Sequence, residues 1–285
     1  MTGEVMTVPK KVQRFDPRQK MNSDTYEMFH YLDLESRHLE AHFHDFYEVF
    51  YFIGGDVDYW IDGSLYALKP GDILLIRPTE LHKPVPRDVT SANYERIVLW
   101  LEKSYLENLE GGMFTTCFAL TADTKILRPS HAVRGQIQPL FEQLVTEYYG
   151  DAFGSKSCVY GILLQFLTHI NRIALSGKAT GESTPTFVTD ILTYINTHYC
   201  EPLTLDDLAS HFFVSKYYLS HEFKKAVGTG VHRYIMLKRL SVAYDLLADG
   251  VSPNQAAVQC GFGDYTAFYR AFRTEYGISP AACGK

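Results

Sequence analysis

The hydrophobic pattern of this chain changes its period once, and that change limits the folds open to it. Between residues 26 and 101, short aromatic and β-branched runs such as YEVFYFI and DILLI are separated by Gly, Asp and Pro, which is typical of antiparallel strands and tight turns. From residue 133 onward, apolar residues recur every three or four positions, as in amphipathic helices. With 285 residues the chain can bury two cores. We therefore expect an all-β domain followed by helical structure.

Local signals refine this division. Asp62-Gly63 is the strongest hairpin signal, because both residues tolerate the positive φ of a tight turn. The amphipathic segments 133–149 and 156–175 are joined by a short connection and predict an antiparallel helical hairpin, which Pro139 should kink or shorten. The exposed face of this hairpin is either a dimer surface or a cap on the β domain. The polar stretch SGKATGESTPT, residues 176–186, is expected to be a linker.

Charge and cysteine usage narrow the functional classes. The net charge of −6 argues against a chain that coats nucleic acid or membrane through bulk charge. From Phe187 onward the basic and acidic residues balance, nine of each, so any DNA binding must be local. The five cysteines are widely spaced without a CxxC pair, which favours reduced thiols. The polar N-terminus and the short apolar run GILLQFL predict a cytoplasmic protein without a membrane segment.

The segment from Leu203 to Gly228 has the pattern of two helices joined by a tight turn. Thr204 and Asp207 resemble a capping box at the first helix, Ser215 caps the second, and Gly228 ends it. A stripe of polar and cationic side chains is left outward on the second helix, a composition suited to base edges and phosphates in a major groove. These candidate DNA-binding residues are Lys216, Tyr217, Ser220, His221 and Lys224.

A second unit of the same kind follows between residues 251 and 280. A helix over Pro253 to Gln259, a turn and a second helix capped by Asp264 repeat the first unit, and an amphipathic helix connects the two. An ordinary solvated helix would show a similar polar face, but the repetition favours DNA reading at two adjacent major-groove segments, about 34 Å apart. The outward residues of this second unit are Tyr265, Thr266, Tyr269, Arg270 and Arg273.

The second unit and the helix before it share one dense set of positions, namely Arg239, Leu240, Ala243, Leu246, Leu247, Gly261, Phe262, Asp264, Phe268, Arg270, Phe272, Arg273, Gly277 and Pro280. This set resembles the signature of the AraC/XylS family of transcription regulators. His221 departs from the pattern, since the family often has Arg there. The resemblance implies double-stranded DNA as a partner, a homodimer, and activation through contact with RNA polymerase. Nothing in these residues distinguishes activation from repression.

In the β half, the stretch HFHDFYEVF spaces two histidines and a glutamate as HxHxxxE. In an unbroken strand His42, His44 and Glu48 share one face, and with His82 they resemble the cupin pattern. Arg96 and Trp100 are expected to border the same pocket. Such a set suits a divalent metal, but it can equally bind a sugar hydroxyl or pair internally. We expect a ligand pocket without a resident metal or other cofactor, and no catalytic residues.

Together these patterns predict a multidomain regulator, with an all-β cupin barrel and helical hairpin followed by an all-α double helix-turn-helix domain. Its cupin would sense a small-molecule effector, by resemblance a carbohydrate or related metabolite. Two alternatives stay open, namely a ligand-independent regulator whose cupin is a dimer scaffold, and a metal-dependent cupin enzyme fused to a DNA-binding domain. The expected parts are a flexible N-terminal arm (1–25), the cupin sensor domain (26–130), a helical dimerisation hairpin (131–175), a linker (176–186) and the DNA-binding domain (187–283).

Overall fold

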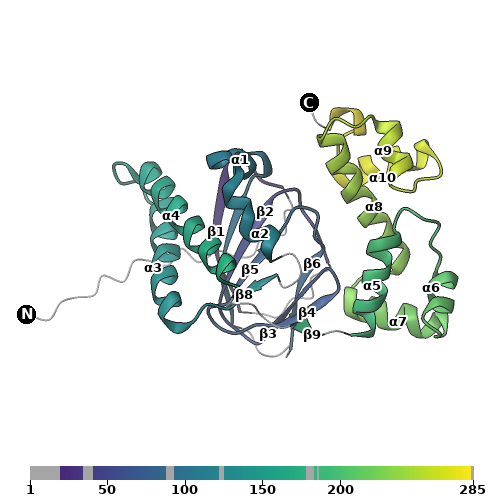
Figure 1. Cartoon of the computed structure of the whole chain (residues 1–285), viewed down its shortest axis with the longest axis horizontal. Helices are drawn as coiled ribbons and strands as arrows, with labels where there is room; N and C mark the ends of the chain where they lie inside the picture. The colour runs from purple at the N-terminus through teal and green to yellow at the C-terminus, as the bar shows by residue number, and fades with distance from the viewer. Residues whose placement is uncertain are drawn as a thin grey trace, which may run out of the picture. The chain divides into compact units, whose positions relative to one another are not determined.

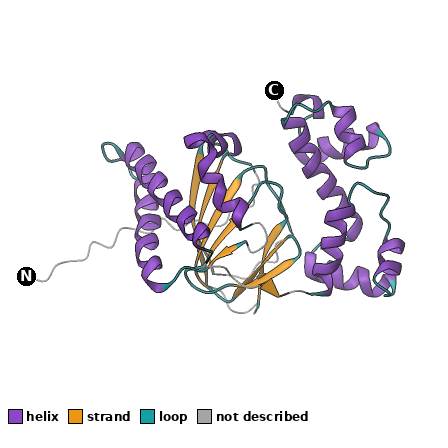
Figure 2. Cartoon of the chain, viewed as in Figure 1, coloured by secondary structure: helices purple, strands orange, loops and turns teal. Residues whose placement is uncertain are grey.

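The structure is a computed structural model that describes residues 20–34, 41–87, 93–121, 125–177, 183–184 and 186–283. Most of the expected N-terminal arm lies outside these residues. The chain divides into two compact units. The first contains all the described strands and the helices up to α4, and the second contains the helices from α5 onward (Figures 1 and 2). The predicted fold class, an all-β domain with helices followed by an all-α domain, is confirmed.

The first unit is built on two antiparallel sheets. One has the strand order β1-β7-β2-β5-β8 and the other β6-β3-β4-β9. Asp62 and Gly63, with φ of 42° and 99°, form the two-residue turn between β3 and β4, so the predicted hairpin is confirmed. The strands are β1 (Tyr26–Asp33), β2 (Tyr47–Gly54), β3 (Val57–Ile61), β4 (Ser64–Ala67), β5 (Ile73–Ile76), β6 (His82–Pro86), β7 (Tyr94–Leu101), β8 (Ile126–Leu127) and β9 (Ser183–Thr184).

Alternation along the strands creates two cores. On β2, Phe50 and Phe52 point between the two sheets into an aromatic core, whereas Val49 and Tyr51 point to the other face and contact the helices. This is the two-residue period expected of a strand buried on both faces. The helices of this unit are α1 (Lys103–Asn108), the 3-10 helix η1 (Leu109–Thr115), α2 (Thr116–Leu120), α3 (His131–Tyr148) and α4 (Ser155–Ser176).

Helices α3 and α4 form the predicted hairpin, with one difference. Helix α3 continues through Pro139 for 18 residues, so the helix is not shortened there, and the alternative expectation of a kink stays a prediction. A proline inside a helix removes one hydrogen bond, but Ile137 and Phe141, on either side of it, are fully buried in the helix–sheet core. That burial offsets the lost bond. Within the stretch expected to be a linker, Ser183–Thr184 forms β9 and pairs with β4.

Among the described residues, α4 alone is long and apolar enough to cross a membrane by length and composition. Its apolar side, which includes Leu163, Phe166 and Ile170, is buried in the core shared with α3 and the sheet. A core helix passes the same test of length and composition, and burial of this side accounts for the hydropathy of α4.

The second unit repeats a short helix and a capped longer helix on either side of α8. Tyr234, near the start of α8, contacts Phe223 of α7 with ring centroids 5.6 Å apart, and the later Leu240 and Ala243 lie in one core with Phe268 of α10. Helix α8 therefore supports both repeats. The helices are α5 (Phe187–His198), α6 (Leu205–His211), α7 (Lys216–Val227), α8 (Val231–Ala248), α9 (Pro253–Gln259), α10 (Tyr265–Tyr276) and the 3-10 turn η2 (Pro280–Ala282).

Candidate functional site

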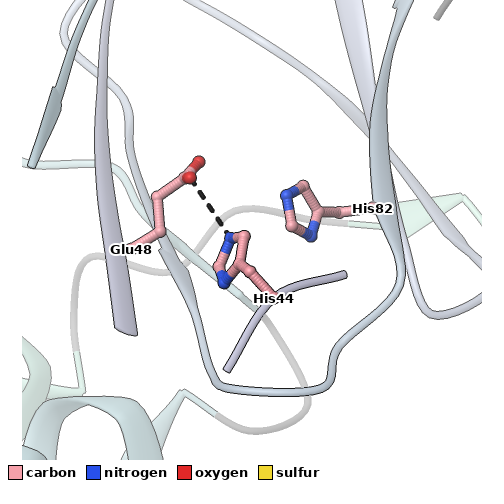
Figure 3. A group of neighbouring side chains, drawn as sticks. All are labelled: His44, Glu48 and His82. Carbon is pink, nitrogen blue, oxygen red and sulfur yellow. Dashed lines mark ion pairs between the residues drawn. The ribbon is translucent and has the colours of Figure 1, made fainter. Parts of the chain in front are cut away.

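Three buried polar side chains converge between the two sheets. His44, Glu48 and His82 are 4%, 5% and 0% exposed, and one potential ligand atom from each lies within 4.8 Å of the other two. Figure 3 shows the side chains directed toward one another. His44 Nε2 and Glu48 Oε2 are 3.3 Å apart. This cluster is the strongest candidate for a small-molecule or metal site in the described part of the β unit.

The backbone that positions the cluster is not the continuous strand expected from the HxHxxxE spacing. Strand β2 begins only at Tyr47, and His42 forms an isolated bridge with His82 through two backbone hydrogen bonds of 3.1 and 2.9 Å. The backbone nitrogen of Thr79 donates to the His44 carbonyl at 2.8 Å. The His42 ring lies near that of His82, with centroids 4.5 Å apart and planes inclined by 58°, while the three-residue cluster forms without it.

Hydrogen bonds to backbone carbonyls fix the tautomer of both histidines. His44 Nδ1 lies 2.9 Å from the carbonyl oxygen of Phe46, and His82 Nδ1 lies 2.8 Å from that of Glu80. A carbonyl oxygen can only accept, so each Nδ1 must carry the proton and donate it. In a neutral imidazole the other nitrogen then presents a lone pair. Both Nε2 atoms are therefore acceptors.

Burial keeps these imidazoles neutral. Desolvation lowers the pKa of His44 to about 4, and it lowers the pKa of His82 well below its usual range, aided by the neighbouring His42 and His44. Both Nε2 atoms are buried without a hydrogen-bond donor in the described structure. Trp100 supports the third member of the cluster, because its indole Nε1 donates to Glu48 Oε2 at 2.8 Å. Neutral imidazoles, a bonded carboxylate and two free lone pairs make this a site for an electron-pair acceptor or a hydrogen-bond donor.

The predicted pocket residue Arg96 lies in a separate arrangement. It is buried and four residues from Trp100 along β7, a separation of about 13 Å in a strand. Its guanidinium donates to Asp33 at 2.7 Å and lies 4.0 Å from the ring centroid of Tyr94. Arg96 thus contacts Asp33 and Tyr94 at the end of the β unit away from the cluster. Trp100, expected beside Arg96 at the border of the pocket, does contact the cluster, because it lies opposite Glu48 in the pairing of β2 with β7.

The predicted DNA-reading residues lie on α7 and α10, and none of them is buried. Ser215 and Asp264 cap the two helices through bonds to the third residue beyond the cap, and Gly228 ends α7 with φ of 89°, as expected. On α7, Lys216 pairs with Asp206 of α6, and His221 lies 3.1 Å from Glu222. The side chains of Lys224, Arg270 and Arg273 are exposed, and within the described structure they form no ion pair.

Several signature residues have structural roles in the helical unit. Arg239 donates to the backbone carbonyls of Tyr199 and Glu201 at 2.7 and 2.8 Å, which ties α8 to the segment after α5. A Cβ at Gly261 would lie 2.2 Å from the Cys200 carbonyl oxygen, so only glycine fits there. Much of the signature therefore maintains the packing of the repeats, while the exposed faces of α7 and α10 carry cationic side chains.

One aromatic residue in this unit was not predicted. Phe213, in the turn between α6 and α7, is 95% exposed and has φ of 55°. A bulky residue with positive φ is strained. Gly261 occupies the equivalent position in the second repeat. In each turn the residue that follows donates its backbone N–H to the carbonyl five residues earlier, from Val214 to Ala209 and from Phe262 to Ala257. Alignment of the two repeats would have indicated a positive φ at Phe213, because glycine occupies the equivalent position.

Comparisons with known proteins agree with this arrangement. An AraC-like ligand binding domain matches residues 29–156, and a helix-turn-helix domain matches residues 208–285. The arabinose operon regulatory protein of Salmonella typhimurium is 27% identical over 77% of this chain and 76% of its own length. Its counterpart from Escherichia coli is 25% identical over 77% and 73%. A crystal structure of an apo ToxT variant from Vibrio cholerae covers 92% of this chain and 98% of its own, with 13% identity and a TM-score of 0.40.

The two family matches cover the β unit and the helical unit in the order found here. The residue pattern that resembled the AraC/XylS signature lies within the second match. The chain belongs to the AraC/XylS family of DNA-binding transcription regulators, with an AraC-like ligand-binding domain ahead of its helix-turn-helix domain.

Proposed function

We propose that α7 and α10 enter two consecutive major-groove segments on one face of DNA. The observation that carries this proposal is the repetition: each helix is 12 residues long, begins with a side-chain cap and ends at a glycine in the left-handed conformation. Each presents an exposed face with cationic side chains, and α8 packs against both helices. Adjacent major-groove segments on one face of DNA are one helical turn apart, about 34 Å.

The β unit supplies the regulatory input in this proposal. It binds a small polar metabolite, a carbohydrate or related compound, as the names of the arabinose operon relatives suggest. The ligand alters how the helical unit meets DNA, and it can do so only through a difference in affinity between two arrangements of the chain. The protein acts in the cytoplasm as a homodimer, contacts RNA polymerase, and performs no catalysis itself.

Footprinting tests the DNA part of the proposal. An operator selected from random DNA by the full-length protein is cleaved with hydroxyl radicals in the presence and absence of protein. We expect two protected segments per bound protomer, on one face and one helical turn apart. Lys224→Ala and Arg270→Ala should each weaken binding by about 1 to 3 kcal/mol if they contact a base, whereas the exposed Arg233→Ala on α8 should not. A single protected segment per protomer would contradict the proposal.

A thermal-shift series against sugars and sugar acids tests the regulatory input. Saturable stabilisation by one compound is expected, because a ligand that binds only the folded state raises its stability with concentration. If none of these compounds stabilises the protein or changes operator affinity, carbohydrate sensing is wrong for this chain. The β domain would then act only as a scaffold, or sense a ligand of a different chemical class.

A further inference from the structure

The cluster of His44, Glu48 and His82 contains acceptors without matching donors. The protons on Nδ1 of both histidines are committed to backbone carbonyls, so their Nε2 lone pairs point into the cluster, and each Nε2 atom is buried without a hydrogen-bond donor. The carboxylate of Glu48 lies beside them, only 3.3 Å from His44 Nε2. Buried polar groups are normally satisfied. The arrangement is therefore incomplete until something with positive character enters it.

Three kinds of occupant would meet the two nitrogens. A proton on one Nε2 atom can donate to only one further acceptor, so it does not satisfy the second nitrogen and the Glu48 carboxylate together. A water or a ligand hydroxyl can donate to the nitrogens but brings no charge to the carboxylate, whose only ion-pair partner in the described structure is the neutral His44. A divalent cation accepts both nitrogen lone pairs and at the same time neutralises the negative charge of the Glu48 carboxylate. The chemistry of the donor set therefore favours a cation.

We propose that His44 Nε2, His82 Nε2 and the Glu48 carboxylate bind one divalent transition-metal ion. Two imidazoles and one carboxylate suit Zn²⁺, Fe²⁺, Co²⁺, Ni²⁺ or Mn²⁺, whereas Ca²⁺ and Mg²⁺ prefer oxygen ligands throughout. Three protein ligands leave further coordination positions open for a small molecule. This inference concerns what the β unit binds, and it does not depend on how the helical unit reads DNA.

The groups around the three ligands match what a metal site requires. Metal-binding histidines usually donate their other ring nitrogen to a carbonyl or carboxylate, which fixes the ring, and both histidines here do so. Trp100 orients Glu48 through a 2.8 Å bond, and Phe46 stacks on the His44 ring with centroids 3.9 Å apart. Two ligands each about 2.1 Å from an ion are at most about 4.2 Å apart. Atoms within 4.8 Å of each other therefore reach an ion through small side-chain rotations.

Metal titration of the full chain tests the proposal. Protein stripped with a chelator and dialysed is titrated with Zn²⁺, Co²⁺, Ni²⁺ and Mn²⁺ by calorimetry, and with Fe²⁺ without oxygen. Visible absorption of bound Co²⁺ reports its ligands. We expect one ion per chain for at least one metal. Glu48→Gln should weaken that binding about 100-fold or more, although Gln retains an oxygen to accept from Trp100, and His82→Gln should do the same.

His30→Gln is the matched control. His30 is as buried as His44, at 4% exposure, but it pairs with Glu95 at 2.8 Å outside the cluster, so metal affinity should stay unchanged. Near-ultraviolet circular dichroism establishes that each variant is folded, and His44→Gln replaces any variant that is not. The proposal is overturned if no metal binds saturably, or if Glu48→Gln binds as tightly as the wild type. Operator binding measured on the same samples is a separate readout, so a failed metal site leaves the DNA proposal intact.

Discussion

The contact between the second repeat and the segment after α5 can be tested at a single glycine. Gly261 has φ of 76°, and a Cβ there would lie 2.2 Å from the carbonyl oxygen of Cys200 and 2.8 Å from its Cα. A left-handed conformation costs a residue with a side chain about 1 to 2 kcal/mol, and forced overpacking about 1 to 3 kcal/mol. Gly261→Ala should therefore lower the free energy of unfolding of the helical unit by about 3 kcal/mol.

Two other glycines separate the cost of the left-handed conformation from the cost of overpacking. Gly250 has φ of 86° but open space around its Cβ position, so Gly250→Ala should cost only about 1 kcal/mol. Gly263 lacks both the positive φ and a close neighbour, and Gly263→Ala should stay within about 0.5 kcal/mol of wild type. If Gly261→Ala costs no more than Gly250→Ala, the close approach of Cys200 to Gly261 does not exist.

Unfolding in urea provides the measurement, and it is monitored in the same samples by circular dichroism and by tryptophan fluorescence. Far-ultraviolet circular dichroism is dominated by helices and reports both units, because α3 and α4 belong to the first one. The part of its transition that is absent from the fluorescence signal therefore reports the helical unit. Fluorescence reports the β unit, because Trp60 and Trp100 are the only tryptophans of the chain and both lie on its strands. Gly261→Ala should shift the dichroism transition and leave the fluorescence transition in place. A shift of the fluorescence transition alone would refute the reasoning.

Three further predictions follow from local geometry. Phe213→Gly should raise stability by roughly 0.5 to 1 kcal/mol in the same urea assay, since it relieves positive φ at an exposed side chain; a loss of stability would show that Phe213 packs in solution. Asp264→Ala removes the cap bond to the Ala267 backbone and should cost about 1 kcal/mol, whereas Asp264→Asn should not. The exposed Cys158 should react with a thiol reagent at mildly alkaline pH, while Cys117, whose pKa burial raises to about 12, should react only in urea; equal rates would contradict this burial.

Helix boundaries in the second unit were predictable because their signals are local. Thr204 and Asp207 form the expected capping box, and the helix expected over Pro253–Gln259 has those bounds. A cap needs only one side chain and a backbone three residues away, so the sequence contains the whole interaction. Periodicity predicted α8 as an amphipathic helix, but its buried residues, among them Val231, Leu237 and Ala243, lie around its whole circumference because both repeats pack against it.

The β site was harder to predict because its geometry depends on distant segments. The spacing of His42, His44 and Glu48 suggested a shared strand face, but the chain pairs His42 with His82 and starts β2 only at Tyr47. The support of Glu48 by Trp100 arises from strand register, which the alternation of one strand does not determine. Likewise, Pro139 stays inside α3 because tertiary burial outweighs its local penalty.

The central claim, that α7 and α10 each read their own half-site, is tested most directly by pairing variants with altered operators. Binding of wild type, Lys224→Ala and Arg270→Ala is measured by fluorescence anisotropy on the selected operator and on versions with one half-site scrambled. Each substitution should cause no further loss of binding free energy on the operator whose scrambled segment is the one its helix reads. On the operator with the other segment scrambled it should cause its full loss, because the effects of independent contacts add. If both variants lose their effect with the same half-site, the two helices do not read separate segments and the account is contradicted.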